Sequence, residues 1–247
     1  MKEAIKNYWE TRLPQNWYSD KKKYSEEYFE EIEHERYKKR YSYYKRLFEV
    51  GKWKGKKILE IGCGIGTDAA THAESGAVVT GIDLTEQAVK DSKELFERKG
   101  LKGEFFTMDS EDLEFPDDHF DMVYSFGVLH HTPKTKEAIM EAFRVCKPGG
   151  KVIMMLYAKG MHYWSIIIRK YWLGGEYKTM SKVECISKWT EKEMNCPLTK
   201  MYGLRELIRL FLPYKISFLG RYYLGRLPFQ KLFEGAFGLH WIVKAKK

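Results

Sequence analysis

The sequence predicts an α/β fold in which helices cover both faces of a mostly parallel sheet. From Lys56 onward, apolar strand-like segments alternate with helical ones. Gly62, Gly64 and Gly66 follow the first predicted strand and precede an Ala-rich helical segment. Glycines allow a sharp turn and a close approach of the backbone to a ligand, and the start of the next helix offers free N–H groups. We therefore expect a ligand site at this turn.

Turn and cap signals bound the predicted elements. Thr85 is a candidate N-cap, Gly100 a candidate helix terminator, and 148–150, Pro-Gly-Gly, a tight turn. Strands are expected at 57–61, 78–82, 103–107, 120–125, 151–157, near 215–219 and at 239–245. Helices are expected at 67–75, 85–99, 134–146 and 203–212.

Two stretches lie outside the alternation. Residues 1–50 are rich in Tyr, Lys and Glu and have helical periodicity between about 24 and 49, so we expect an N-terminal helical cap on a main domain of residues 51–247. Residues 158–200 follow the fifth strand and are expected to form a lid insertion over the carboxyl ends of the strands, where such folds bind ligands. The insertion contains aromatic residues that we expect to be buried: Tyr163, Trp164, Tyr171 and Trp172.

The composition indicates a globular chain. It has 247 residues, of which 44% are hydrophobic and 31% charged. The net charge of +9 attracts anions, but no RNA-binding module accompanies it, so a solvated Lys-rich surface is the alternative and a nucleic-acid partner is not expected. Four cysteines without metal-ligand spacing predict no metal site and a reducing, cytoplasmic location. We recognise no signal peptide and no apolar stretch long enough to span a bilayer.

Asp83 ends the second predicted strand, about 20 residues after the glycine turn, where nucleotide-binding folds place an acid that binds ribose hydroxyls. Thr67 stands where the dinucleotide fingerprint requires its third glycine. This spacing argues against NAD.

The segment 58–68, Ile-Leu-Glu-Ile-Gly-Cys-Gly-Ile-Gly-Thr-Asp, resembles motif I of the class I S-adenosylmethionine (SAM) methyltransferases. Later segments resemble further motifs of that class in the same order: 105–111, 115–125, 128–133 and 143–150. Within the class, the chain is similar to the methyltransferase type 11 group, relatives of ubiquinone-biosynthesis enzymes. The resemblance implies a Rossmann-like, mostly parallel seven-stranded sheet and a SAM-dependent methyltransferase that releases S-adenosylhomocysteine.

The resemblance also implies how the methionine part of SAM is held. Gly62, Gly64 and Gly66 would shape its pocket, Glu60 would orient the loop and Asp68 would reach the amino group. For each acid implied to bind SAM, a helix cap or a loop hydrogen bond is the alternative.

For the adenosine part, the same resemblance implies ribose binding by Asp83 and packing of Leu84 against adenine. Asp109 would meet the adenine amino group, with Ser110 and Glu111 beside it. The sulfonium end would be lined by Ser125 and Phe126.

Methyl transfer requires that the acceptor is held in the correct position, and sometimes that a base removes its proton. His130 and His131 lie in the loop after the fourth strand, and a neutral His there could accept a proton; capping or loop hydrogen bonding is the alternative. Tyr8, Trp9 and Tyr157 are candidates to cover the cofactor or to line the acceptor site, with simple packing as the alternative.

We therefore expect methyl transfer to a small-molecule acceptor of apolar or aromatic character. An RNA or protein methyltransferase and a non-catalytic SAM-binding protein are the alternatives. Residues 221–237 mix arginines with aromatic side chains and are a candidate for peripheral membrane contact, with packing or a subunit interface as the alternative. No feature of the sequence predicts an oligomeric state.

Overall fold

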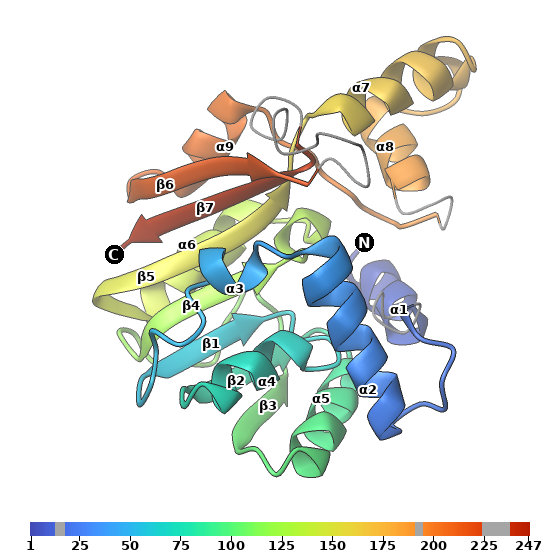
Figure 1. The fold of residues 1–247 in the computed structure, drawn as a ribbon. Helices are drawn as coiled ribbons and strands as arrows, with labels where there is room; N and C mark the ends of the chain where they lie inside the picture. The colour runs from blue at the N-terminus through green and yellow to red at the C-terminus, as the bar shows by residue number, and fades with distance from the viewer. Residues whose placement is uncertain (13–17, 191–194, 224–237) are drawn as a thin grey trace.

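The computed structural model describes residues 1–12, 18–190, 195–223 and 238–247. These residues form a seven-stranded sheet with the strand order β3-β2-β1-β4-β5-β7-β6 (Figure 1). Strands β1 to β5 run parallel, and β7 is antiparallel to both of its neighbours. The predicted fold class is thereby confirmed. The strands are β1 Lys57–Ile61, β2 Val78–Asp83, β3 Gly103–Thr107, β4 Phe120–Phe126, β5 Cys146–Tyr157, β6 Lys215–Tyr222 and β7 His240–Lys246.

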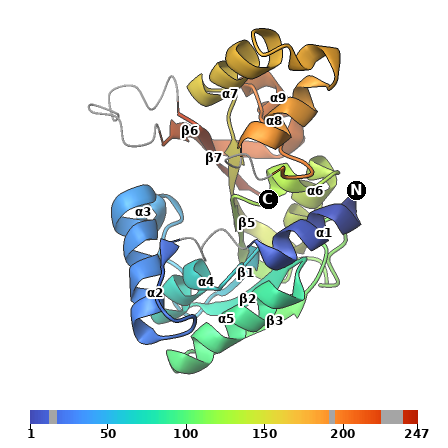
Figure 2. The same cartoon turned by 90° about the vertical axis from the view of Figure 1, so that its right-hand side faces the viewer.

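Helices cover both faces of the sheet (Figure 2). Successive strand residues point to opposite faces, so Ile58 of β1 packs in one apolar core and Leu59 in the other. The core around Ile58 includes residues of α2, α3, α4 and α5, whereas the core around Leu59 includes residues of α6 and α9. These helices are α2 Glu26–Glu33, α3 Tyr44–Leu47, α4 Thr67–Glu74, α5 Glu86–Arg98, α6 Thr135–Val145 and α9 Leu204–Phe211.

Most boundaries lie within one residue of the sequence-based expectation; strand β6 ends three residues later, and two larger differences concern β5 and the N-terminal helical stretch. Strand β5 begins at Cys146 because the Pro-Gly-Gly turn forms a bulge within it: Cys146 pairs with Phe120, and the ladder resumes where Lys151 pairs with Met122. The helical stretch expected over 24–49 is divided into α2, a π-helical segment at His34–Arg40, and α3. A further helix, α1 at Lys2–Thr11, precedes these elements.

The insertion after β5 forms a small helical lobe that projects beyond the sheet (Figure 1). It contains α7 Met161–Ile166, a π-helical turn at Ile167–Trp172, a 3-10 turn at Glu176–Lys178, and α8 Lys182–Thr190. The expected burial of its aromatic residues is wrong for Trp164 and Trp172, which are 55% and 52% exposed. Each ring packs against a neighbouring tyrosine, Trp164 against Tyr163 at 5.1 Å and Trp172 against Tyr177 at 5.4 Å between ring centres, and is otherwise half exposed.

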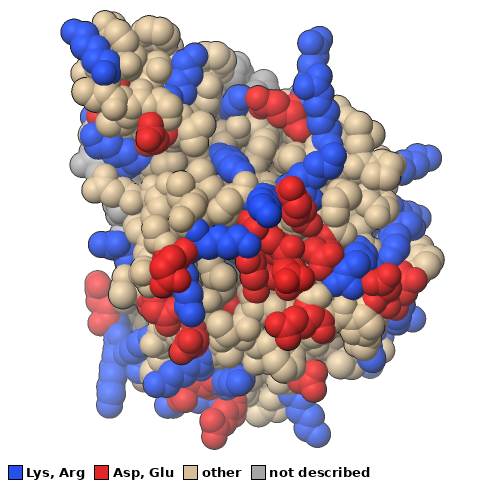
Figure 3. Space-filling model, turned by 180° about the vertical axis from the view of Figure 1, so that it is seen from behind, with Lys and Arg blue, Asp and Glu red and all other residues tan. Residues whose placement is uncertain are grey.

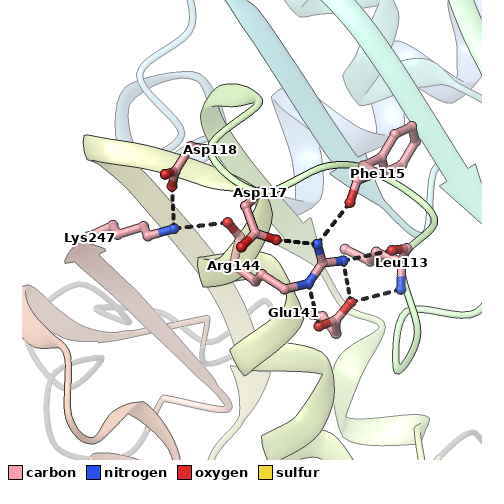
Figure 4. Close-up of polar contacts among 7 residues, drawn as sticks. All are labelled: Leu113, Phe115, Asp117, Asp118, Glu141, Arg144 and Lys247. Atoms are coloured by element: carbon pink, nitrogen blue, oxygen red, sulfur yellow. Dashed lines mark hydrogen bonds and ion pairs between the residues drawn. The ribbon is translucent and has the colours of Figure 1, made fainter.

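The loop before β4 is fixed to α6 by one arginine. Arg144 donates hydrogen bonds to the carbonyl oxygens of Leu113 and Phe115 and to the carboxylates of Asp117 and Glu141 (Figure 4). Hydrogen bonds to Glu141 and Asp117 raise the pKa of Arg144 above its usual range. The network anchors a loop that would otherwise carry unpaired carbonyl groups.

The stretch expected to contact a membrane, 221–237, lies mostly outside the described residues. Its first residue, Arg221, donates to the carbonyl oxygen of Lys159 at 2.8 Å, and its guanidinium lies 4.5 Å from the ring centre of Trp241. In the described residues, none of the helices combines the length and the apolar character that crossing a bilayer requires.

Candidate active site

A cavity of about 740 Å³ lies at the carboxyl ends of the parallel strands. Its wall has two halves, which we name by their most prominent features. The glycine-loop half contains Gly62, Gly64, Asp83, Leu84, Met108, Asp109 and Ser110. The aromatic half contains Phe126, Met155, Tyr157, His162, Tyr223, Leu239 and His240. The wall also includes Arg36, Arg40, His131 and residues of α1 and α7.

The glycine turn forms part of the wall with its backbone alone. Gly62 has a φ of +81°, and a Cβ atom there would lie 2.2 Å from Cγ2 of Val128. Only glycine fits this conformation and this contact without displacement. Gly66 lies off the wall, where it begins α4 with a φ of +82° and packs against Ser92.

Asp83 links the glycine turn to the end of β2. One carboxylate oxygen accepts a hydrogen bond from the backbone N–H of Gly64 at 3.1 Å, and the other accepts from the N–H and hydroxyl of Thr85 at 3.0 and 2.8 Å. Burial raises the pKa of Asp83 above its usual range, although these hydrogen bonds lower it. The carboxylate therefore makes loop hydrogen bonds and also borders the cavity beside Leu84.

The acids after β3 face α1. Lys2 Nζ lies 2.5 Å from a carboxylate oxygen of Asp109 and 2.5 Å from one of Glu111. Asp109 and Ser110 line the cavity, whereas Glu111 is not among the wall residues and binds Thr132 and the backbone N–H of Lys134. Glu111 thus makes loop hydrogen bonds, the role that the sequence offered as the alternative to binding SAM.

Arg36 brings a guanidinium group to the cavity wall. Asp68 is buried below the wall and accepts hydrogen bonds from Nε of Arg36 at 2.6 Å, from Nη2 of Arg36 and from the hydroxyl of Tyr37 at 2.6 Å. Arg36 itself lines the cavity, and no described residue binds its Nη1 atom. Burial would lower the pKa of Arg36, but Asp68 raises it well above the usual range.

Arg36 was missed in the sequence, although it falls four residues after Ile32 on the apolar side of the N-terminal helical stretch. A charged side chain on the apolar side of a helix is unusual, and this could have indicated a functional role for Arg36.

Glu60, near the end of β1, is buried. Burial together with the charge of Asp68 raises the pKa of Glu60 well above its usual value. Neither Glu60 nor Asp68 is a wall residue.

The two candidate bases occupy different environments. His131 lines the cavity, and its Nδ1 lies 2.8 Å from the carbonyl oxygen of Leu198, which assigns the proton to Nδ1 and makes Nε2 the acceptor nitrogen. His130 is buried behind the wall and stacks on Tyr157 at 3.8 Å between ring centres. Burial lowers the pKa of His130 well below its usual value. His131 is therefore the candidate base of the pair.

The aromatic half is built around His240, the first residue of β7. Its ring is nearly parallel to those of Tyr157 and Tyr223, with centre distances of 5.6 and 4.9 Å, and its Nδ1 lies 2.7 Å from the hydroxyl oxygen of Tyr43. Burial lowers the pKa of His240 to about 3. His240 is therefore uncharged at neutral pH, and it adds polar ring atoms to a surface that is otherwise mainly aromatic and apolar.

The remaining predicted residues divide between wall and core. Trp9 lines the cavity and packs against His131 at 5.0 Å between ring centres, whereas Tyr8 is buried off the wall. Phe126 lines the cavity, whereas Ser125 is buried in β4 and donates to the carbonyl oxygen of Ile61 at 2.9 Å.

Comparison with known proteins identifies the class of this site. Residues 59–154 match the family model described as a methyltransferase domain. A sterol 24-C-methyltransferase of Gibberella zeae is 35% identical over 105 residues, which are 41% of this chain and 28% of that protein. A ubiquinone biosynthesis O-methyltransferase of Coxiella burnetii is 33% identical over 99 residues, 40% of this chain and 42% of that protein.

A solved structure matches over the whole chain. The magnesium protoporphyrin IX methyltransferase from Synechocystis PCC 6803, determined with bound S-adenosylhomocysteine, has a TM-score of 0.67 and 16% identity, with 100% of both chains covered. The two sequence matches above span less than half of the relatives' own length. Together, the comparisons confirm the predicted class I methyltransferase fold and the predicted resemblance to SAM-dependent enzymes.

Proposed function

We propose that this chain transfers the methyl group of SAM to a nucleophilic atom of a small-molecule acceptor, and the match of residues 59–154 to the methyltransferase domain model supports this. The observation that carries the proposal is the single cavity whose glycine-loop half continues into an aromatic half. Such a cavity has room for a cofactor at one end and an acceptor at the other, so the two reactants could meet inside it.

The glycine-loop half fits SAM. The close contact at Gly62 leaves bare backbone along the cavity, as a tightly bound methionine part requires. Arg36 would bind the carboxylate of that part through Nη1, with Asp68 holding the guanidinium in place. Asp83 would accept from the ribose hydroxyls, and Asp109 would accept from the adenine amino group. SAM, when bound, supplies the electrophilic methyl group.

The aromatic half favours an acceptor with an apolar or aromatic body. Phe126, Met155 and Tyr157 offer it apolar surface, and His240 offers one polar atom. His131, with its proton fixed on Nδ1 by Leu198, would accept the acceptor's proton at Nε2. The two relatives named above, a sterol and a ubiquinone-biosynthesis methyltransferase, support an acceptor of this character.

Binding and transfer can be tested separately. Calorimetry of the purified chain should detect SAM and S-adenosylhomocysteine but not NAD. Methyl-labelled SAM is then incubated with catechols, sterols, phosphoethanolamine and bulk tRNA in parallel, and label is expected in a small molecule. Label entering tRNA instead would contradict the small-molecule acceptor, and NAD binding without a response to S-adenosylhomocysteine would contradict the cofactor.

We propose in addition that the protein works in a reducing compartment, as the cytoplasm is. The basis is that all four cysteines are buried thiols outside any disulfide.

A further inference from the structure

The insertion lobe carries an exposed apolar stripe. Met161, Trp164, Ile168 and Trp172 recur at spacings of three or four residues along α7 and the following π-helical turn, which places them on one side of that helix. Leu173 continues the stripe and is 80% exposed. Ile166 and Ile167 point the other way, into the apolar cluster of the lobe. The helix is therefore apolar on two sides and is packed on only one of them.

The lobe that carries this stripe is net cationic, and Lys182 Nζ lies 5.9 Å from the ring centre of Trp172. Residues 161–190 contain five Lys or Arg side chains and two Glu side chains. Glu176 is engaged within the lobe, where it accepts hydrogen bonds from Lys188 at 2.9 Å and from the indole N–H of Trp189 at 2.8 Å. In Figure 3 the lobe lies at the upper left, with uncharged surface bordered mainly by blue side chains. The cations of the lobe are Arg169, Lys170, Lys178, Lys182 and Lys188.

We propose that this stripe docks the protein on an anionic lipid surface. Exposed Trp and aliphatic side chains flanked by Lys and Arg are the composition of helices that lie in the membrane interface, and Trp favours the headgroup level. Charge complementarity selects this occupant over a second copy of the chain. Two lobes meeting face to face would bring like charges together, whereas anionic headgroups would neutralise them.

The docked helix is continuous with the cavity. Met161, His162 and Ser165 of α7 belong to the cavity wall. Trp164 of α7 and Ile168 of the π-helical turn that follows are each more than half exposed. Docking would therefore hold the aromatic half of the cavity next to the bilayer, where apolar acceptors dissolve. This last step rests on the proposed function, but the docking itself does not, and its test requires no acceptor.

Flotation with lipid vesicles tests the docking. The full chain, saturated with S-adenosylhomocysteine, is mixed with vesicles of phosphatidylcholine alone or with about one third phosphatidylglycerol. The protein should float with the anionic vesicles, and less so at high salt. The double variant Trp164→Gln/Trp172→Gln, which leaves the charge unchanged, should lower the partition coefficient about tenfold or more, the scale of removing a large side chain from an apolar contact. Each Lys→Gln change at Lys178 or Lys182 should lower it about fivefold.

The matched control alters exposed apolar residues elsewhere. Leu204→Gln/Ile208→Gln on α9 replaces two comparably exposed apolar side chains, also without a change of charge, and should leave flotation close to that of the wild-type chain. Thermal unfolding verifies that each variant is folded. Equal flotation of the Trp and α9 variants would overturn the proposal. So would a wild-type chain that ignores the vesicles, or one whose Trp variant only changes from dimer to monomer in gel filtration.

Discussion

The close contact between Gly62 and Val128 allows a quantitative prediction for Gly62→Ala. The φ of +81° costs an L-residue about 1–2 kcal/mol. The new Cβ would also lie 2.2 Å from Cγ2 and 2.8 Å from Cγ1 of Val128, and compression of this kind costs about 1–3 kcal/mol. We therefore expect the free energy of unfolding to fall by about 2–5 kcal/mol, and affinity for S-adenosylhomocysteine to fall because the loop must move.

Urea unfolding of a double-mutant cycle separates the two causes. Val128→Ala removes both Cγ atoms but leaves Cβ, 2.9 Å from the new methyl group, so it should recover only part of the compression and none of the backbone strain. Gly149→Ala is the control, because Gly149 has a φ of +76° and no atom within 4 Å of its built Cβ. If Gly62→Ala cost no more than Gly149→Ala, or if the cycle showed no coupling, the steric argument would be refuted.

Four further predictions address the site. Asp83→Ala should weaken SAM binding by about 1.5–3 kcal/mol in calorimetry, because it removes a charge-assisted hydrogen bond; unchanged affinity in a folded variant would exclude this role. His131→Ala should lower turnover about 10²–10⁴-fold with cofactor affinity intact, whereas a wild-type rate would leave the residue structural. In hydrogen exchange, S-adenosylhomocysteine should protect α1 and the 158–200 insertion as well as the glycine turn; protection of the turn alone would contradict a lid. Finally, burial lowers the pKa of His240 from 6.5 to about 3, so between these values only the unfolded chain takes up the proton. Stability should fall as pH decreases below 6.5, by up to about 1.4 kcal/mol per pH unit from this residue, and urea midpoints for His240→Phe should fall less steeply.

Local sequence patterns determined the core of this fold. A parallel strand buried on both faces is a short apolar run closed by a turn signal, and for this reason 57–61 was located to the residue. The edge strand at 103–107 was also located to the residue, although Phe105 is its one buried side chain. The positions of Gly62 and Asp83 were equally predictable, because the turn after β1 and the end of β2 are adjacent strand ends in such a sheet. The cap at Thr85 followed from its hydroxyl, which accepts from the N–H of Ala88.

Contacts between segments distant in the sequence were decided only by the tertiary structure. The carboxylate of Asp68 could have faced the cavity or the core, and the choice was made by Arg36, 32 residues earlier. His131 and His130 are adjacent in the chain, yet the carbonyl oxygen of Leu198, 67 residues after His131, holds only one of them at the wall.

The exposure of Trp164 and Trp172 has the same origin. Helical periodicity predicts which side chains share one side of a helix, but it does not specify which side meets the core. That outcome depends on the surface the rest of the chain offers, and the small cluster around Ile166, Ile167 and Cys185 buries only one side of this helix. The sequence by itself therefore determined the sheet, the glycine turn and the class of cofactor. The tertiary structure alone decided which charged, imidazole and indole groups reach the cavity or the surface, because burial is settled by packing between distant segments and not by local periodicity.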